Sequence, residues 1–423
     1  HKEYRRQRQM CIRDSVETIP VVGTEDQIDI VYSVDEETTG SVGGNIGYSD
    51  FGLMLGFNLQ EQNFLGSGNT VGIGINKNIY SEMYNLSFMN PYATKDGVSL
   101  GYNVYFRETD YGEFNVANYL TNSNGFGAQF GYPTSDITRL GFNVTYDKTD
   151  IDVGTLPALE IYDFVSAEGN IFETLSVQFS WQRITLNRGL FPTAGSSTVI
   201  SLSTTVPGSD LSYYRSSIRQ RYYRPLSSNF VFGFSGELGY LDAYGETEET
   251  PFFQNFYAGG PRSLRGFESN TLGPRSTDAP CYEFNYEDKT CPNLIDTDGD
   301  GELDAPYINP YAGSTSRYRD RPIGGNIKVE GSMQLIFRLP FIEDQRSLRS
   351  AFFFDFGNVF SDNCKDYQNN CYKPALEDLR YSYGVGVTWI TGFGPLSLAI
   401  SKPTNAGPQE RTEEFQFTVG NVF

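Results

Sequence analysis

Histidine is nearly absent from this chain of 423 residues, and its absence excludes many catalytic sites. The only histidine is His1, at the terminus, which excludes imidazole triads, His-ligated zinc and histidine general bases. Basic residues are also scarce, since 32 Lys and Arg stand against 52 Asp and Glu, for a net charge of −20. This charge argues against a nucleic-acid partner, because phosphate binding needs clustered cations. We expect the protein not to be an enzyme and to need no cofactor.

Long apolar runs are missing too. No segment reaches the roughly 18 apolar residues that a membrane-spanning helix needs, which excludes a helical membrane protein. The sequence nevertheless contains 15% aromatic residues and 44 glycines, with a polar mean hydropathy. A transmembrane β-barrel has this composition, because half of each strand faces lipid and half faces a wet lumen.

The first fourteen residues differ from the rest of the chain. They contain Lys2, Arg5, Arg6, Arg8 and Arg13 but no apolar run. We therefore predict that residues 1–14 are a non-native or disordered tail, which leaves Cys11 without a role.

Alternation of apolar and polar side chains predicts β-strands in several windows. Residues 71–75, 140–146, 175–181 and 381–389 alternate apolar side chains with Gly, Ser, Thr, Asn or Gln. A period of two is typical of a half-buried strand. A soluble β-sandwich alternates in the same way, so alternation alone does not decide the fold.

The connections favour a membrane barrel over a sandwich. Seven segments have the composition of tight turns: residues 63–69, 90–97, 131–138, 188–196, 224–229, 339–347 and 392–395. Longer polar connections lie between them: residues 108–123, 147–173, 244–326, 361–378 and 401–413. Short turns on one rim and long loops on the other are typical of outer-membrane barrels.

The turns also give the number of strands. Seven turns join fourteen strands, and residues 40–48 and 413–423 add one strand at each end. We predict an all-β fold, a sixteen-stranded antiparallel transmembrane barrel over residues 39–423. Side chains cannot fill so wide a barrel, so we expect the long connection, residues 244–326, to enter the lumen.

Several longer motifs are more specific than alternation: YAGGPRSLRGFESN from Tyr257, FFFDFGN from Phe352 and the ending EEFQFTVGNVF. They resemble the BamA family, the central outer-membrane proteins of the β-barrel assembly machinery. The resemblance covers nearly the whole chain after Thr24. It implies that residues 15–38 are the end of the last POTRA domain, in the periplasm, and that the chain is a fragment. The long loops would be extracellular or in the lumen of a barrel in the bacterial outer membrane.

The resemblance also implies a loop anchor. Its expected members are Leu264, Arg265, Gly266 and Phe267 in the loop, with Phe353, Asp355, Gly357 and Gln334 on the wall. A guanidinium in the lumen needs a carboxylate to offset desolvation, so we expect Arg265 to pair with Asp355. Gln334 stands where the family pattern has a second acid, and Glu330 is the alternative partner.

The first and last strands are predicted to form a lateral seam. The first strand is rich in glycine, which weakens a strand. The last strand would present aromatic residues to lipid and end on Phe423, a sorting signal in the family. The seam residues are Ser41, Val42, Gly43, Gly44, Asn45, Ile46, Gly47, Tyr48, Phe415, Phe417, Val419, Gly420 and Phe423. We expect Val419 to lie opposite Ile46, to within a few residues. Crowding in a barrel wall is the alternative explanation of the glycines.

The function that the resemblance implies is the insertion and folding of other β-barrel proteins. A client strand would pair with the edge of the first strand. The expected partners are outer-membrane lipids, unfolded outer-membrane protein clients, accessory lipoproteins and periplasmic chaperones. A two-partner-secretion translocator, a passive porin and a soluble adhesin remain alternatives.

Cysteines and acidic residues cluster in the long connections. We expect disulfides between Cys281 and Cys291 and between Cys364 and Cys371, because export leads to an oxidising compartment. Asp296, Asp298, Asp300 and Asp304 have the spacing that opens a calcium loop, but the twelfth position is Tyr307. A solvated acidic loop tip is therefore favoured over a Ca²⁺ site, and we assign no metal.

Overall fold

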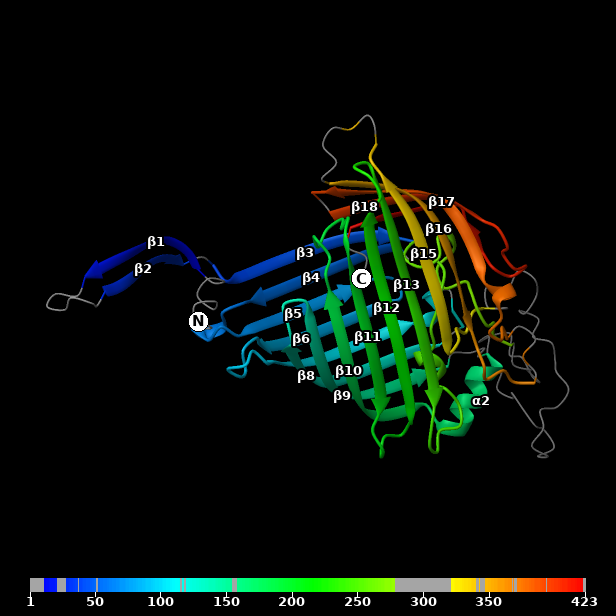
Figure 1. Ribbon diagram of the computed structural model, residues 1–423. Helices are drawn as coiled ribbons and strands as arrows, with labels where there is room; N and C mark the ends of the chain where they lie inside the picture. The colour runs from blue at the N-terminus through cyan, green and yellow to red at the C-terminus, as the bar shows by residue number, and fades with distance from the viewer. Residues whose placement is uncertain are drawn as a thin grey trace.

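Sixteen antiparallel strands close into one barrel in the computed structural model (Figure 1). The structure describes residues 11–20, 28–36, 38–50, 52–114, 116–117, 119–153, 158–277, 321–339, 342, 347–366, 368, 371–392 and 394–420. The barrel strands are β3 (Gly40–Ser49), β4 (Gly52–Glu61), β5 (Thr70–Lys77), β6 (Ser81–Asn90), β7 (Ser99–Asp110), β8 (Leu120–Pro133), β9 (Thr138–Asp152), β10 (Ile171–Ile184), β11 (Gly195–Thr205), β12 (Tyr213–Pro225), β13 (Phe230–Ala243), β15 (Ile327–Phe337), β16 (Leu348–Phe360), β17 (Arg380–Thr391), β18 (Gly394–Pro403) and β20 (Phe415–Val419). The predicted fold and strand number are confirmed.

The connections divide between the two rims as predicted. All seven predicted turns join neighbouring strands on one rim, from β4–β5 to β17–β18. We call this end the turn rim and the opposite end the loop rim. Two connections on the loop rim are also short, those between β3 and β4 and between β5 and β6.

Alternation places apolar side chains on the outside of the barrel and polar ones inside. In β10, Leu175 and Phe179 are exposed on the outer surface, whereas Ser176 and Gln178 line a cavity in the lumen. Such a wall suits lipid on one face and water on the other. Among the described residues, no helix has the length and apolarity to span a membrane.

A separate hairpin precedes the barrel. Strand β1 (Cys11–Pro20) pairs with β2 (Ile28–Glu36) in an antiparallel ladder. Residues 11–14 of the predicted tail belong to β1 and are therefore not disordered. Residues 1–10 lie outside the described part, and the non-native origin of residues 1–14 stays a prediction. The POTRA assignment of residues 15–38 stays a prediction.

The barrel interior is partly filled by the connection between β13 and β15. Its strand β14 (Gly266–Phe267) pairs with β19 (Thr412–Glu413). Six residues of this connection and its surroundings form an apolar cluster with Val359: Leu241, Phe256, Ala258, Leu264, Phe267 and Leu272. Fully burying each large side chain stabilises the fold by about 2 kcal/mol. The predicted entry of the loop into the lumen is thus observed for its described part.

A second apolar cluster covers the lumen at the loop rim. Helix α2 (Leu159–Glu168) contributes Ile161 and Phe164, which pack with Tyr119, Phe172 and Phe252. The helix ends before Gly169, whose φ of +95° favours glycine. The short 3-10 helices are η1 (Phe64–Gly66), η2 (Tyr111–Phe114), η3 (Phe252–Gln254) and η4 (Leu376–Asp378).

Candidate functional site

Arg265 and Asp355 form a bidentate ion pair between the loop and the wall. Nε of Arg265 donates to Oδ2 of Asp355 at 2.7 Å, and Nη2 donates to Oδ1 at 2.8 Å. The backbone N–H of Arg265 also donates to Oδ2, at 3.2 Å. Asp355 is fully buried, and the guanidinium carbon lies 3.4 Å from the ring centre of Phe353. The expected pair is present, with the fork geometry that fixes the orientation of the loop.

The second wall contact of Arg265 is Ser332, which the sequence did not indicate. Nη2 of Arg265 donates to Oγ of Ser332 at 3.0 Å. Gln334 donates to the same hydroxyl at 3.3 Å. Glu330 binds the loop through another residue, because it accepts a hydrogen bond from Ser263 at 2.9 Å and pairs with Lys328. Gln334, at the position of the expected second acid, thus shares the hydroxyl of Ser332 with Arg265.

The neighbours of Arg265 have geometric reasons for their identities. Leu264 and Phe267 are fully buried in the apolar cluster of the loop. Gly266 has a φ of +92°, which disfavours any other residue. On the wall, a Cβ at Gly357 would lie 2.5 Å from the carbonyl oxygen of Val329. Strands β15 and β16 can therefore lie this close together only because residue 357 is glycine.

Gln416 connects the same loop motif to the last strand. The N–H of Gly266 donates to Oε1 of Gln416 at 3.2 Å, and Nε2 of Gln416 donates to the carbonyl of Phe267 at 2.8 Å. The N–H of Glu268 donates to the carbonyl of Arg411 at 3.0 Å, next to the β14–β19 pair. Sequence reasoning missed Gln416. The signal that could have found it is its position between Phe415 and Phe417, because alternation along a strand turns it to the lumen when its neighbours face lipid.

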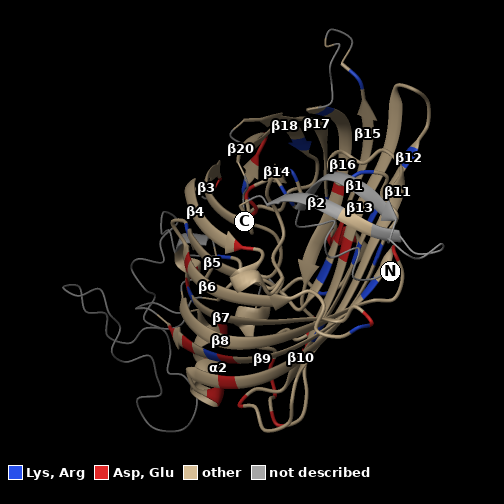
Figure 2. Cartoon of the chain, turned by 90° about the vertical axis from the view of Figure 1, so that its left-hand side faces the viewer, with Lys and Arg blue, Asp and Glu red and all other residues tan. Residues whose placement is uncertain are grey.

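The seam between β3 and β20 is weakly paired. In the described residues the two strands share one pair, Val419 with Tyr48, whereas β20 pairs with β18 at five positions. The rings of Tyr48 and Phe417 stack with centroids 5.4 Å apart. The observed partner Tyr48 lies two residues from the expected Ile46, which is within the expected few residues. Among the residues that the structure describes, the edge of β3 between residues 40 and 47 has no pair with β20 (Figure 2).

The glycines of the seam do not share one explanation. A Cβ at Gly44 would meet nothing within 4 Å, and one at Gly43 only a carbonyl at 4.0 Å. Crowding therefore does not explain these two glycines. Gly420 differs, because its φ is +78° and a Cβ would lie 2.3 Å from the carbonyl oxygen of Ile46. The backbone of the last strand can approach β3 there only because Gly420 has no side chain.

The remaining seam residues follow the prediction where they are described. Phe415 and Phe417 are exposed on the outer surface, as are Val42 and Ile46. Ser41, Asn45 and Gly47 lie in β3. Phe423 lies outside the described residues.

One of the two expected disulfides lies in the described part of the chain. Cys364 and Cys371 are joined, in the connection between β16 and β17. The expected pair of Cys281 and Cys291 lies outside the described residues. So does the calcium candidate, Asp296, Asp298, Asp300 and Asp304.

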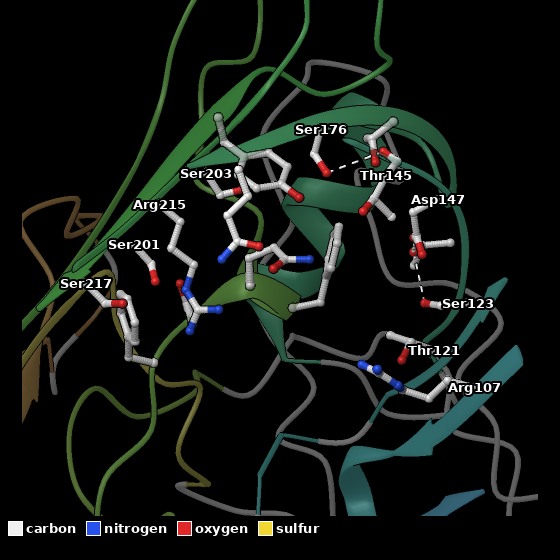
Figure 3. A pocket seen from close by; sticks show the side chains of 18 of the residues that line it. Arg107, Thr121, Ser123, Thr145, Asp147, Ser176, Ser201, Ser203, Arg215 and Ser217 are labelled. Atoms are coloured by element: carbon white, nitrogen blue, oxygen red, sulfur yellow. Dashed lines mark hydrogen bonds between the residues drawn. The ribbon is translucent and has the colours of Figure 1, made fainter. Parts of the chain in front are cut away.

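A hydrophilic cavity of about 620 Å³ occupies the lumen beside the loop (Figure 3). Rows of hydroxyl groups line the cavity, and such a polar lining suits a water-filled lumen. Among its lining residues are Ser123, Thr145, Ser176, Ser201, Ser203 and Ser217. Arg215 stands over the ring of the loop residue Phe256, with 4.3 Å between the guanidinium carbon and the ring centre. The lumen therefore contains both the described part of the loop and a cavity with a polar lining.

These features define a class: outer-membrane barrels of sixteen strands in which a long loop is ion-paired to the inner wall. Known proteins identify the family within this class. The model of the Omp85 superfamily domain matches residues 63–423. The chain therefore belongs to the Omp85 superfamily.

Relatives within and near this family include bacterial and animal proteins. The outer membrane protein assembly factor BamA of Neisseria meningitidis serogroup B is 29% identical, over 96% of this chain and 50% of that protein. The chain thus spans about half the length of this curated relative. The sorting and assembly machinery component 50 homolog of Mus musculus is 22% identical, over 85% of this chain and 67% of that protein.

Solved structures agree with the sequence relatives. The crystal structure of BamA from Haemophilus ducreyi lacking POTRA domains 1–3 has a TM-score of 0.82 and 31% identity, covering 99% of this chain and 77% of that one. CdiB from Escherichia coli has a TM-score of 0.56 and 11% identity, with 96% and 67% covered, and shares the fold alone. The resemblance to the BamA family and the outer-membrane location are confirmed.

Proposed function

We propose that this chain inserts and folds β-barrel proteins in the bacterial outer membrane. The observation that carries the proposal is the seam, where β3 and β20 share one residue pair in the described part of the chain. An unpaired strand edge offers backbone N–H and C=O groups to an incoming strand. Backbone pairing tolerates many client sequences, because it does not depend on side chains.

The rest of the seam supports the same role. Gly43 and Gly44 weaken β3 without any steric need for glycine, so the strand can exchange partners at low cost. Burial of a client's apolar face in lipid would supply the free energy of insertion. In this proposal β3 pairs with the C-terminal strand of the client, and the turn rim faces the periplasm.

The proposed partners follow from this role. They are outer-membrane lipids, unfolded outer-membrane protein clients, periplasmic chaperones and the accessory lipoproteins of an assembly complex. The names of two relatives support these partners, because one is an outer membrane protein assembly factor and the other a component of a sorting and assembly machinery. The reaction needs no bond to be made or broken, so the protein acts as an insertase and not as an enzyme.

A reconstitution experiment tests the proposal. Proteoliposomes containing the chain should fold an added, urea-unfolded outer-membrane barrel faster than protein-free liposomes, as measured by heat-modifiable gel migration. The control is the chain unfolded before reconstitution. Steady ion conduction without faster client folding would contradict the proposal and favour a porin.

A further inference from the structure

The described residues of the turn rim carry an excess of cations from β9 to β16, although the whole protein is acidic. Seven arginines lie at these strand ends: Arg139, Arg183, Arg188, Arg221, Arg224, Arg338 and Arg349. Figure 2 shows blue positions at the end of β15 and along β12. Among the described residues of this part of the rim, Asp136 is the one acid. None of the seven arginines forms an ion pair in the described part of the chain.

Three of these arginines line one cavity. Arg188, Arg338 and Arg349 surround a space of about 1010 Å³ at the turn-rim ends of β10–β13, β15 and β16. The other described lining side chains are apolar or uncharged, and they include Phe191, Val231, Ile336, Ser227, Ser228 and Asn229. We call this space the arginine vestibule. No acid is among the described residues that line the space, and three like charges placed together repel one another, which favours the binding of an anion.

Arg349 has an unsatisfied donor in the vestibule. Its Nη2 is buried and has no hydrogen-bond partner among the residues that the structure describes. The guanidinium carbon lies 4.8 Å from the ring centre of Tyr223 and 5.9 Å from that of Phe191, so aromatic faces hold the planar group in place. A buried donor without an acceptor is costly, and a ligand oxygen would satisfy it. A planar guanidinium fits a carboxylate in particular.

The vestibule belongs to the interior of the barrel. It shares Phe191 and Arg349 with a neighbouring cavity that is lined by Arg265 of the loop and Gln416 of β20. An anion reaching it comes through the lumen mouth at the turn rim. This position favours a polypeptide over the headgroup of a phospholipid in the surrounding membrane.

We propose that the arginine vestibule binds the carboxylates of an acidic segment of an unfolded client. The inference rests on the proposed function, in which clients arrive at the turn rim and their loops must reach the other side. Charged segments cross lipid only at high cost. This chain, an outer-membrane barrel itself, has a net charge of −20 and an acidic stretch in its longest connection, Asp296 to Asp304. A cationic lumen mouth complements such segments.

Peptide binding tests the proposal without any assembly reaction. The probe is a fluorescent peptide with the sequence of residues 294–305, LIDTDGDGELDA, and its fluorescence anisotropy is measured with the full chain in phosphatidylcholine nanodiscs. The first variant combines Arg188→Gln, Arg338→Gln and Arg349→Gln. The matched control combines Arg139→Gln, Arg183→Gln and Arg224→Gln, which removes the same charge from the same rim outside the vestibule. Heat-modifiable migration verifies folding, and the pair Arg188→Gln with Arg338→Gln serves if the triple variant does not fold.

The vestibule variant should bind the peptide about tenfold more weakly than the wild type, and the control should change the affinity by less than about twofold. A peptide with Asn and Gln in place of Asp and Glu should not bind. Equal losses in both variants, or no loss in either, would overturn the proposal. So would loss of peptide binding in phosphatidylglycerol nanodiscs at equal ionic strength, because a lipid headgroup would then occupy the arginines. Peptide binding and client folding are measured separately, so failure of the vestibule proposal can be told apart from failure of the proposed function.

Discussion

At the scale of single residues, the loop is held by charge-assisted hydrogen bonds to groups that are removed from water. Asp355 is fully buried, and its two carboxylate oxygens accept three hydrogen bonds from Arg265. Gln416 is only 2% exposed and binds both polar groups of the Gly266–Phe267 backbone that face it. Each contact is therefore expensive to break by removing one partner alone.

Arg265→Ala should lower the free energy of unfolding by about 3 kcal/mol, because it leaves the buried Asp355 carboxylate without a counter-charge. Urea unfolding in lipid bilayers measures this. The double variant with Asp355→Ala should be little worse than either single variant, since the second change removes an orphaned charge. Ser332→Ala, which removes one contact of Arg265, is the control and should cost about 1 kcal/mol. Additive losses in the double variant would show that the two residues do not act as a pair.

Gln416→Leu should release the loop motif from the last strand. The N–H of Gly266 and the carbonyl of Phe267 would lose their partner, at a cost of about 2 kcal/mol. Hydrogen exchange of the amides of residues 264–268 should become faster. Gln334→Leu, on the neighbouring part of the wall, loses a bond to Ser332 only and should leave this exchange unchanged. Unchanged exchange in Gln416→Leu would refute the link.

At the scale of elements, β3 and β20 differ from the other barrel strands in pairing and in composition. Strand β20 has five residues and β3 has ten, of which only Tyr48 pairs with β20 in the described part of the chain. The long ladder between β8 and β9 pairs at fourteen positions. Pairing between the described residues is therefore weakest where the first and last strands of the barrel meet.

Gly44→Val and Gly420→Ala should have opposite effects on the seam. Nothing lies within 4 Å of a Cβ at Gly44, and valine favours strands, so stability should rise by about 0.5–1 kcal/mol while client folding slows. Gly420→Ala should destabilise by about 1–3 kcal/mol, because its φ is positive and its Cβ would strike the backbone of β3. Thermal unfolding measures both changes. Destabilisation by Gly44→Val would show that the glycine has a structural purpose after all.

Helix α2 at the loop rim should respond to pH through Glu160. Burial raises the pKa of this carboxyl, although Thr277 and Gln368 donate hydrogen bonds that partly oppose the shift. A raised folded pKa means that the folded state holds the proton more tightly. The stabilisation is complete below the usual value of 4.5 and is lost as the pH rises through the folded pKa. Hydrogen exchange of residues 159–168, corrected for the intrinsic rate, should report this loss, and Glu160→Gln should remove it.

At the scale of the whole molecule, the sequence predicts the barrel well because a strand's pattern is local. Alternation with a period of two shows which side of the wall each residue faces, and the short turns mark the ends of the strands. The ion pair of Arg265 and Asp355 came from the family resemblance, and the structure shows the two groups in contact. Contacts of Gln416, Ser332 and Ser263 could not be predicted, because they depend on the path of a loop through the lumen. The partner of Val419 could be predicted only to within a few residues, and it lies two residues from Ile46, because the register across the closure of a barrel depends on the stagger of all the strands.

The central claim is that β3 and β20 must separate for a client to be folded. Tyr48→Cys combined with Val419→Cys places two thiols at the residue pair that closes the seam. The control is Val42→Cys with Leu59→Cys, a residue pair between β3 and β4, two strands that stay paired in the proposed function. Client folding by proteoliposomes is measured after oxidation and again after reduction. The account predicts that the seam crosslink abolishes client folding and that reductant restores it, while the control stays active throughout; full activity of the oxidised, crosslinked seam variant would contradict it.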